Sequence, residues 1–474
     1  MALLCGVLSM MNEYEKFINK KRQALQPMGF DPVCELNKNL FDWQAVTVEW
    51  AVKRGRAALF EECGLGKTLQ QLAWAEQVVK KTNKPVMLHC PVGVRQQTKN
   101  EANKFRIDAE VVIANDQSEV VKGINLVNYE KLHHFDTSKF SGVVLDESSI
   151  LKNAFGKVKK QLIEGYKLTP YRLACTATPS PNDHIELGTH AEFLGVCERE
   201  DMMSKYFVHD GSDTSKWRLR GHARKHFWKW VATWAVCLSK PSDIGGTDEG
   251  FDLPDLNIAR HVVKADDTVP IDGLLFNVSG ISATTIHEEK RLTCEARCKK
   301  VADLVNDRAD AVVIWCDTNY EADSLLEKVD DCIEIRGTHK EAVKESLLQR
   351  FSSGEAKRLI TKPSVAGFGM NWQHCNHQVF AGLSYSFESY YQAVRRCWRF
   401  GQDKAVDVDI VLAETESALH SAIANKESDH RLMRSEMAEA MKSASRKEIG
   451  IDTGKARYIT GLEVKVPSFI GEQS

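Results

Sequence analysis

Several features that would place this chain in a special class are missing from its sequence. No apolar run approaches the length of a membrane span, and the apolar residues 2–11 follow no basic residue, so we expect neither a membrane segment nor a secretory signal. The 13 cysteines include no C-x-x-C pair, which argues against a disulfide framework or a zinc site. Free thiols of this kind are typical of a reducing compartment, so we expect a cytoplasmic protein. The formal net charge is only -2, so any contact with nucleic acid requires a local basic surface.

What the chain does contain is the pattern of a large α/β protein. Its 474 residues exceed one ordinary core, which predicts two or three domains. Short apolar runs alternate with helical patterns in two successive sets, which predicts parallel sheets flanked by helices. The expected strands of the first set are residues 57–60, 85–90, 110–114, 124–128, 142–145 and 171–174. Those of the second set are residues 311–315, 332–335, 358–361, 378–381 and 408–412.

The expected domain boundaries follow from this alternation of strands and helices. We expect an N-terminal helical extension, a first lobe, a basic and aromatic helical insertion, a second lobe and a charged C-terminal tail. The corresponding ranges are 1–38, 39–199, 200–289, 290–428 and 429–474.

A glycine-containing turn after the first expected strand predicts a phosphate-binding loop. Gly64, Leu65 and Gly66 lead into Lys67 and Thr68, where a helical pattern begins. Two glycines let several backbone N–H groups face one anion, and the start of the helix adds partial positive charge. Lys67 would then reach the outer phosphates of ATP, and the Thr68 hydroxyl would bind Mg²⁺. The usual G-x-x-x-x-G-K-[ST] pattern has Gly where this chain has Glu61.

Two adjacent carboxylates end another expected strand of the first set. Asp146 and Glu147 follow the apolar residues 143–145, about 80 residues after the glycine turn. At that edge of a parallel sheet, Asp146 would hold Mg²⁺ and Glu147 would activate an attacking water.

The middle of the chain combines positive charge with aromatic residues. Residues 214–242 contain no acidic residue but include Lys216, Arg218 and Arg220. Such a composition can bind phosphates and stack bases. Alternatively, Phe227, Trp230 and Trp234 fall at helical spacing, which is typical of a stripe that packs into a core.

Together with these motifs, two further stretches resemble one family. The stretches are Thr176-Ala177-Thr178-Pro179 and Gln392-Ala393-Val394-Arg395-Arg396-Cys397-Trp398-Arg399-Phe400-Gly401-Gln402. They resemble superfamily 2 helicases, and among these the Snf-type, chromatin-remodeller-like DNA translocases with their bacterial and phage relatives. In that branch, the phosphate loop has acidic residues at the positions that Glu61 and Glu62 occupy here.

The resemblance, over about residues 40–415, implies two RecA-like lobes with ATP in the cleft between them. It assigns Gln44 to adenine, Thr176 and Thr178 to the coupling of hydrolysis with DNA contact, and Gly367, Gly369 and Asn371 to a motif near DNA. It places Gln392, Arg396 and Arg399 in the catalytic apparatus of the second lobe. The two arginines are three residues apart, so we expect them on one helix face.

The implied function is an ATP-dependent helicase or translocase, functional as a monomer, that moves along nucleic acid. Double-stranded DNA is favoured by the resemblance, whereas an RNA helicase on the same scaffold is the nearest alternative. A second alternative is an ATP-switched subunit that positions a DNA-modifying partner. A nucleic-acid-binding module with an inactive ATP site is the third, although Lys67, Glu147 and both arginines are present.

Overall fold

The computed structural model describes residues 27–152, 156–181, 183–209, 217–264, 290–366, 371–384, 386–414 and 417–448. These residues form two compact units. Unit 1 consists of the chain up to Asp248 and the chain from Arg431 onward, and unit 2 comprises Glu249–His430. Because the described part begins at residue 27, most of the expected N-terminal extension lies outside it, and residues 27–41 form loops and turns.

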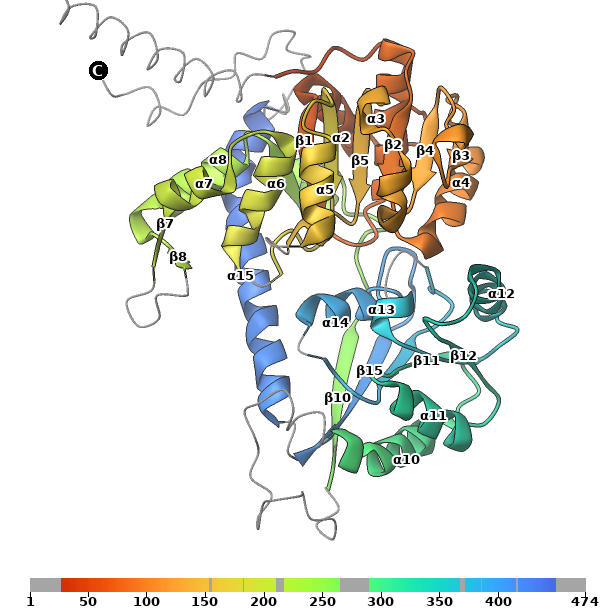
Figure 1. Ribbon diagram of the computed structural model, residues 1–474. Helices are drawn as coiled ribbons and strands as arrows, with labels where there is room; N and C mark the ends of the chain where they lie inside the picture. Colours follow the sequence, from red (N-terminus) through yellow and green to blue (C-terminus); the bar gives the residue numbers. More distant parts are fainter. Residues whose placement is uncertain are drawn as a thin grey trace, which may run out of the picture. The chain divides into compact units, whose positions relative to one another are not determined.

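Unit 1 is built on a seven-stranded sheet in the order β3-β4-β2-β5-β6-β1-β9 (Figure 1). Every neighbouring pair in it is parallel, as the sequence predicts. The strands are β1 Arg56–Glu61, β2 Val86–His89, β3 Val111–Ile113, β4 Ile124–Val127, β5 Gly142–Asp146, β6 Tyr171–Cys175 and β9 Ala235–Leu238. The helices are α2 Asp42–Arg54, α3 Lys67–Thr82, α4 Arg95–Lys104, α5 Lys157–Gly165, α6 Leu187–Leu194, α7 Arg199–Tyr206 and α8 Arg224–Val231.

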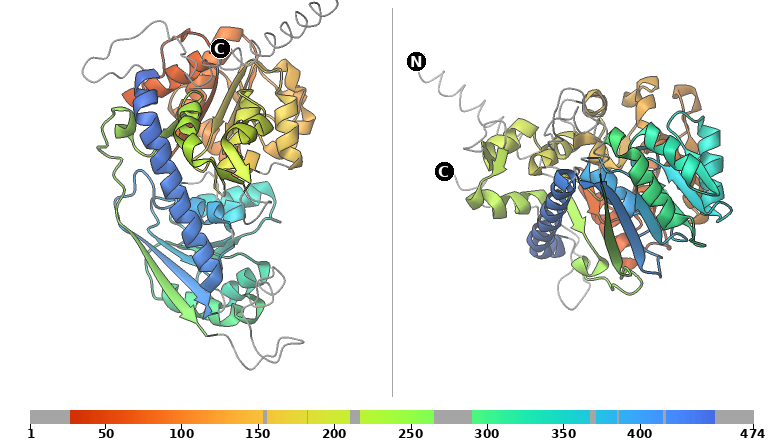
Figure 2. Two further views of the ribbon diagram at one scale, coloured as in Figure 1. Left: turned by 90° about the vertical axis from the view of Figure 1, so that its left-hand side faces the viewer. Right: turned by 90° about the horizontal axis from the view of Figure 1, so that it is seen from below.

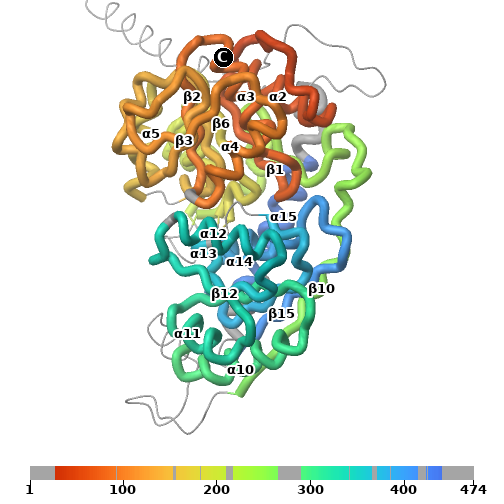
Figure 3. Tube along the Cα trace, turned by 90° about the vertical axis from the view of Figure 1, so that its right-hand side faces the viewer, coloured from red at the N-terminus to blue at the C-terminus, as the bar shows by residue number. Residues whose placement is uncertain are grey.

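The sheet of unit 1 is covered on both faces, since its strands β2, β4 and β9 are buried along their whole length. Val143 and Leu145 of β5 belong to the main hydrophobic core, which they share with residues of α5, α6, α7 and α8. Gly142 points to the other face, where a Cβ atom would lie 3.0 Å from a methyl carbon of Val78 on α3. Helix α3 therefore packs closely on β5, and α2 lies beside α3 (Figure 3).

The segment expected to be a helical insertion is shared between the two units. β9 pairs with β1 and extends the first sheet, whereas β10, Leu256–Val263, pairs with β15 and extends the second sheet. Between α7 and α8, strands β7 (Phe207–His209) and β8 (Trp217–Leu219) form an antiparallel hairpin (Figure 1). The helical description of residues 200–289 is therefore wrong for these four strands, each of which is identified by the strand it pairs with.

Unit 2 contains a six-stranded parallel sheet in the order β10-β15-β14-β11-β13-β12. Its further strands are β11 Val312–Trp315, β12 Cys332–Ile335, β13 Arg358–Thr361, β14 His377–Phe380 and β15 Val406–Ala413. Its helices are α10 Cys294–Val305, α11 Asn319–Lys328, α12 Glu341–Ser352, α13 Pro363–Ala366 and α14 Phe387–Val394. β10 and β15 run side by side for eight residues (Figure 2).

Alternate residues of the unit 2 strands enter different cores. Val312 and Ile314 pack with α10 and α11, whereas Val313 and Trp315 pack with residues of α12 and α14. The last helix, α15 (Ser417–Glu448), begins in unit 2 and contributes Met433 and Met437 to the core of unit 1. None of the helices in the described ranges is long and apolar enough to cross a membrane.

Candidate nucleotide site in unit 1

Three segments with predicted functional residues leave the same edge of the first sheet. In the strand register, Leu59 of β1 and Asp146 of β5 both lie opposite Cys175, the last residue of β6. Because these strands are parallel, the chain that follows each of them emerges at the carboxyl edge, where ligands of α/β sheets bind. The sheet therefore brings together the glycine loop, Glu147 and the segment that begins at Thr176.

The glycine loop has the backbone that a phosphate-binding loop requires. Gly64 and Gly66 have φ angles of 90° and 74°, which L side chains rarely adopt, and Gly66 caps the start of α3. The Lys67 amino group lies over this loop and donates to the carbonyl oxygens of Glu61 (2.9 Å) and Glu62 (3.0 Å). The positive start of α3 and the lysine amine therefore converge where an anion would bind.

Gln44 supports this loop from α2. Its buried side chain donates to the Leu65 carbonyl at 2.8 Å and accepts from the backbone N–H of Phe41 at 3.0 Å. A Cβ atom on Gly66 would lie only 2.6 Å from the Gln44 amide nitrogen. The residue expected to contact adenine thus also fixes the loop, and glycine at position 66 leaves room for it.

Asp146 is held at the end of β5 by two polar side chains. Gln71 of α3 donates to one Asp146 carboxylate oxygen at 2.9 Å, and the Tyr129 hydroxyl donates to the Asp146 carbonyl at 2.6 Å. Desolvation raises the pKa of Asp146 to about 6, with a smaller contribution from the negative charge of Glu147, while the Gln71 bond and the positive charge of Lys67 oppose the shift. A nearby cation would therefore strongly favour its ionised form.

Glu147 has an unusual backbone conformation. Its φ angle is 64°, in the left-handed region that is costly for a non-glycine residue. The Thr176 hydroxyl donates to a Glu147 carboxylate oxygen and accepts from the backbone N–H of Thr178 at 2.9 Å. The two motifs predicted to activate water and to couple hydrolysis to DNA are thus joined directly.

The donors at this edge fit a magnesium nucleotide. Thr68 lies one helical turn before Gln71 on α3, so its hydroxyl is on the helix face that meets Asp146. A hydroxyl and a carboxylate are oxygen ligands of the kind that Mg²⁺ prefers, and the ion characteristically retains water and phosphate oxygens as further ligands. Thr68 and Asp146 would hold the ion, while Lys67 and the loop would hold the phosphates.

Unit 2 carries the glutamine and arginine motif. Gln392 lies on α14 and is buried, and the polar atoms of its amide have no hydrogen-bond partner among the described residues. The expectation that Arg396 and Arg399 share a helix face is wrong, because α14 ends at Val394 and both arginines lie in the following turns. There the backbone N–H of Arg396 bonds the Ala393 carbonyl, three residues back, whereas that of Trp398 bonds the Val394 carbonyl, four residues back, and Gly401 has a φ angle of 83°.

Neighbouring residues stabilise these turns. The Arg395 guanidinium lies 4.2 Å from the centre of the Trp398 ring, a cation–π contact. The Gln402 amide donates to the carbonyls of Gln373 and Cys375 at 3.0 and 3.1 Å. Arg395 thus has a structural role in these turns.

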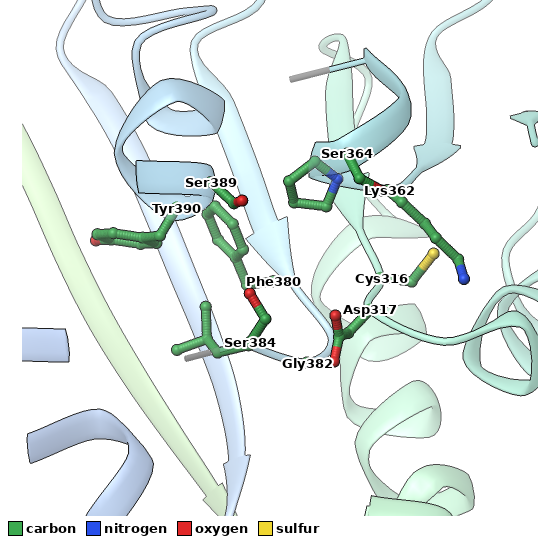
Figure 4. A pocket seen from close by; sticks show the side chains of 11 residues that line it. Cys316, Asp317, Lys362, Ser364, Phe380, Gly382, Ser384, Ser389 and Tyr390 are labelled. Atoms are coloured by element: carbon green, nitrogen blue, oxygen red, sulfur yellow. The ribbon is translucent and has the colours of Figure 1, made fainter. Parts of the chain in front are cut away.

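A small, partly open hollow lies at the carboxyl edge of the second sheet. Phe380, Ser389 and Tyr390 form one side, and Cys316, Asp317, Lys362 and Ser364 form the other (Figure 4). Ser364 opens the glycine-bearing motif expected near DNA. Gly367 and Gly369 of that motif lie outside the described residues. The side-chain oxygen of Asn371 is buried and has no hydrogen-bond partner among the described residues.

The basic and aromatic segment divides into a packed part and an exposed part. Phe227, Trp230 and Trp234 are buried in the core of unit 1, so the packing interpretation is confirmed for them. On the β7–β8 hairpin, Arg218 is exposed, whereas Arg220 donates to the Ser204 carbonyl at 3.2 Å. Lys216 lies outside the described residues.

Sequence reasoning missed the residues that orient the site. Gln70 donates to the Glu61 carboxylate at 2.7 Å, and Gln71 and Tyr129 hold Asp146. One signal was present in the sequence: two adjacent glutamines follow Lys67 and Thr68 in a helix whose other residues are largely apolar. Tyr129 carried no signal, because its contact depends on the fold.

Two parallel-sheet α/β units, the first with a phosphate loop and strand-end carboxylates, define a P-loop protein with tandem RecA-like lobes. The SNF2-related domain model matches residues 43–206, and the helicase conserved C-terminal domain model matches residues 296–401. The chain belongs to the SNF2-related group of superfamily 2 helicases.

Curated relatives are distant. The chain is 21% identical over 413 residues to SWI/SNF-related matrix-associated actin-dependent regulator of chromatin subfamily A-like protein 1 of Xenopus tropicalis, covering 80% of this chain and 43% of the relative. It is 24% identical over 411 residues to the uncharacterized ATP-dependent helicase YqhH of Bacillus subtilis, covering 75% of this chain and 71% of that helicase. The chain thus spans less than half the length of the Xenopus relative.

Among solved structures, the chain is similar to the Sulfolobus solfataricus SWI2/SNF2 ATPase core in complex with dsDNA. The sequence identity is 18%, the TM-score is 0.42, and the match covers 89% of this chain and 98% of that one.

Proposed function

We propose that this chain hydrolyses Mg²⁺-ATP and uses the energy to move along nucleic acid, most favourably double-stranded DNA. The observation that carries the proposal is the network at the carboxyl edge of the first sheet. There Lys67 lies over the phosphate loop, Gln71 holds Asp146 and Thr176 holds Glu147. Membership of the SNF2-related group and the helicase C-terminal match support the coupling to nucleic acid.

In this proposal the residues of unit 1 bind Mg²⁺-ATP and activate the attacking water. Lys67 and the N–H groups at the start of α3 neutralise phosphate charge, and Thr68 and Asp146 bind Mg²⁺. Glu147 orients and deprotonates the attacking water, with its carboxylate fixed by Thr176. From unit 2, Gln392, Arg396 and Arg399 complete the charge stabilisation that family resemblance assigns to them.

The hollow of unit 2 is a suitable phosphate contact for the nucleic-acid backbone. Lys362 and Ser364 follow β13 directly and line it together with the hydroxyl of Ser389. An ammonium group and hydroxyl donors are the groups that proteins use on backbone phosphates. The exposed Arg218 of unit 1 would add a second basic contact.

The test of the activity is an ATPase assay with duplex DNA, single-stranded DNA and RNA in parallel, together with triplex displacement for movement along a duplex. We expect duplex DNA to stimulate turnover most and Lys67→Ala to abolish it. Greatest stimulation by RNA would establish the RNA helicase instead. Negligible turnover with every nucleic acid would overturn the proposal and favour the ATP-switched subunit.

The nucleic-acid contact is tested by its salt dependence. Lys362→Ala should weaken DNA binding and reduce the slope of log K against log salt by about one unit, because one phosphate contact is lost. Lys357→Ala is the matched control, since Lys357 is exposed just before the amino end of the same strand. The double variant Arg218→Ala and Arg220→Ala tests the hairpin in the same way. An unchanged slope would exclude the corresponding surface.

A further inference from the structure

Arg434 belongs to the C-terminal helix α15 yet reaches the nucleotide site of unit 1. The part of α15 from Arg431 onward is assigned to unit 1, where Met433 and Met437 enter the hydrophobic core. Glu436 forms an ion pair with Arg224 of α8 at 2.7 Å. Met433 and Met437 therefore anchor the helix on both sides of Arg434, and the arginine itself is buried.

The guanidinium of Arg434 joins three segments at the carboxyl edge of the first sheet. One terminal nitrogen donates to the Ala177 carbonyl at 2.7 Å, and the other donates to the Leu238 carbonyl at 2.8 Å. Its Nε atom lies 3.6 Å from a carboxylate oxygen of Glu62. Leu238 in turn accepts from the backbone N–H of Glu62 at 2.9 Å, so β9 and the loop are tied together at the same point.

Each partner of Arg434 adjoins a residue of the site. Ala177 lies between Thr176, which holds Glu147, and Thr178, whose N–H bonds Thr176. The Glu62 carbonyl accepts from the Lys67 amine. The arginine thus lies between the segment that fixes the water-activating carboxylate and the loop that would hold the phosphates.

An arginine suits this task better than another cation would. Its guanidinium is planar and rigid and presents five donors at fixed angles, so two carbonyls bound to it are held in one geometry. A lysine retains the charge but binds as a single point. We propose that Arg434 is a positioning residue that sets the Thr176–Thr178 segment against the phosphate loop, and that this clamp makes turnover depend on the chain that follows unit 2. The proposal deepens the function proposed above and rests on it.

The experiment uses the full chain with Arg434→Lys, Arg434→Ala and the control Glu436→Gln. Glu436→Gln removes an ion pair of the same helix but touches no residue of the site, so its turnover should equal that of the wild type. For Arg434→Lys we expect kcat to fall about tenfold or more with a smaller change in KM, because misplacing a catalytic group by ~1 Å costs up to about 100-fold. Millimolar guanidinium should restore part of the turnover of Arg434→Ala and none of that of Lys67→Ala.

Amide hydrogen exchange provides a readout that does not depend on turnover. Exchange of residues 62–66 and 176–178 should be faster in Arg434→Lys than in Glu436→Gln, at equal thermal unfolding midpoints. Unchanged exchange, an unchanged kcat in Arg434→Lys, or an equal loss of turnover in Glu436→Gln would each overturn the positioning role. A wild type without turnover would refute the proposed function, and the exchange rates with the affinity for a fluorescent ADP would still decide whether Arg434 shapes the site.

Discussion

The hydroxyl of Thr176 donates a hydrogen bond to the carboxylate of Glu147, and the two residues directly follow the adjacent strands β6 and β5 of the first sheet. The same hydroxyl oxygen accepts from the backbone N–H of Thr178. A carboxylate held in this way has its rotation restricted and one of its oxygens occupied. The other oxygen is the one that remains for a water molecule.

Thr176→Val should reduce turnover with little effect on nucleotide affinity. The valine keeps the shape of the side chain but leaves Glu147 without its donor, and a hydrogen bond to a charged group contributes about 1.5–3 kcal/mol. This corresponds to a decrease in kcat of about 10- to 100-fold. Steady-state ATPase kinetics and fluorescent ADP binding check it. The control Thr233→Val removes a buried hydroxyl bonded to the Trp230 carbonyl at the opposite edge of the sheet and should behave as wild type.

Glu147→Gln should retain ATP binding and abolish hydrolysis. The amide is nearly isosteric, so the phosphate loop and its lysine are undisturbed, but it cannot accept a proton from water. Equilibrium binding of ATP and single-turnover hydrolysis measure the two properties separately. Glu164→Gln, at an exposed position of α5, is the matched control. Unchanged turnover in Glu147→Gln would remove this residue from the role of base.

Glu61 makes the stability of unit 1 depend on pH. Desolvation raises its pKa from 4.5 to about 7, against opposing contributions from Lys67, Gln70 and Arg434. The folded state therefore favours the protonated form, so its contribution is fully present below about pH 4.5 and is lost as the pH rises through 7. Relative to Glu61→Gln, the wild type should lose on the order of 3 kcal/mol of unfolding free energy between pH 4.5 and pH 8. Chemical denaturation of both proteins without nucleotide, at a series of pH values, tests this expectation. Parallel curves of unfolding free energy against pH for the two proteins would contradict it.

Gly382→Ala should destabilise unit 2. A Cβ atom there would lie 2.6 Å from a carboxylate oxygen of Glu321 and 3.0 Å from a guanidinium nitrogen of Arg297, and these two side chains form a fully buried ion pair. Overpacking of this kind costs about 1–3 kcal/mol, measurable by chemical denaturation. Gly337→Ala is the control in the same unit, because its nearest neighbouring atom would be 3.8 Å away. Equal stability of the two variants would show that the pair can move aside.

The sequence was informative where a local pattern, such as an apolar run, is sufficient to define a strand. Apolar runs predicted eleven strands, including the edge strands β3 and β12. The positions of Asp146 and Glu147 at the end of one such run, and of Lys67 in the turn that follows another, correctly indicated the carboxyl edge of the first sheet. Sequence patterns did not predict β9 and β10, which are identified as strands by their pairing with β1 and β15. They also missed Arg434, whose three partners are 196 residues or more away along the chain and meet it only in the fold.

The order of the units along the chain has a practical consequence. The polypeptide leaves unit 1 at Asp248 and returns to it at Arg431, so unit 2 is a continuous stretch and unit 1 is not. An expression fragment that stops at residue 248 contains the glycine loop, Asp146 and Glu147 but lacks Arg434. Such a fragment would expose the apolar surface that Met433 and Met437 cover. A faithful minimal version of unit 1 requires both stretches, the chain up to Asp248 and the chain from Arg431 onward.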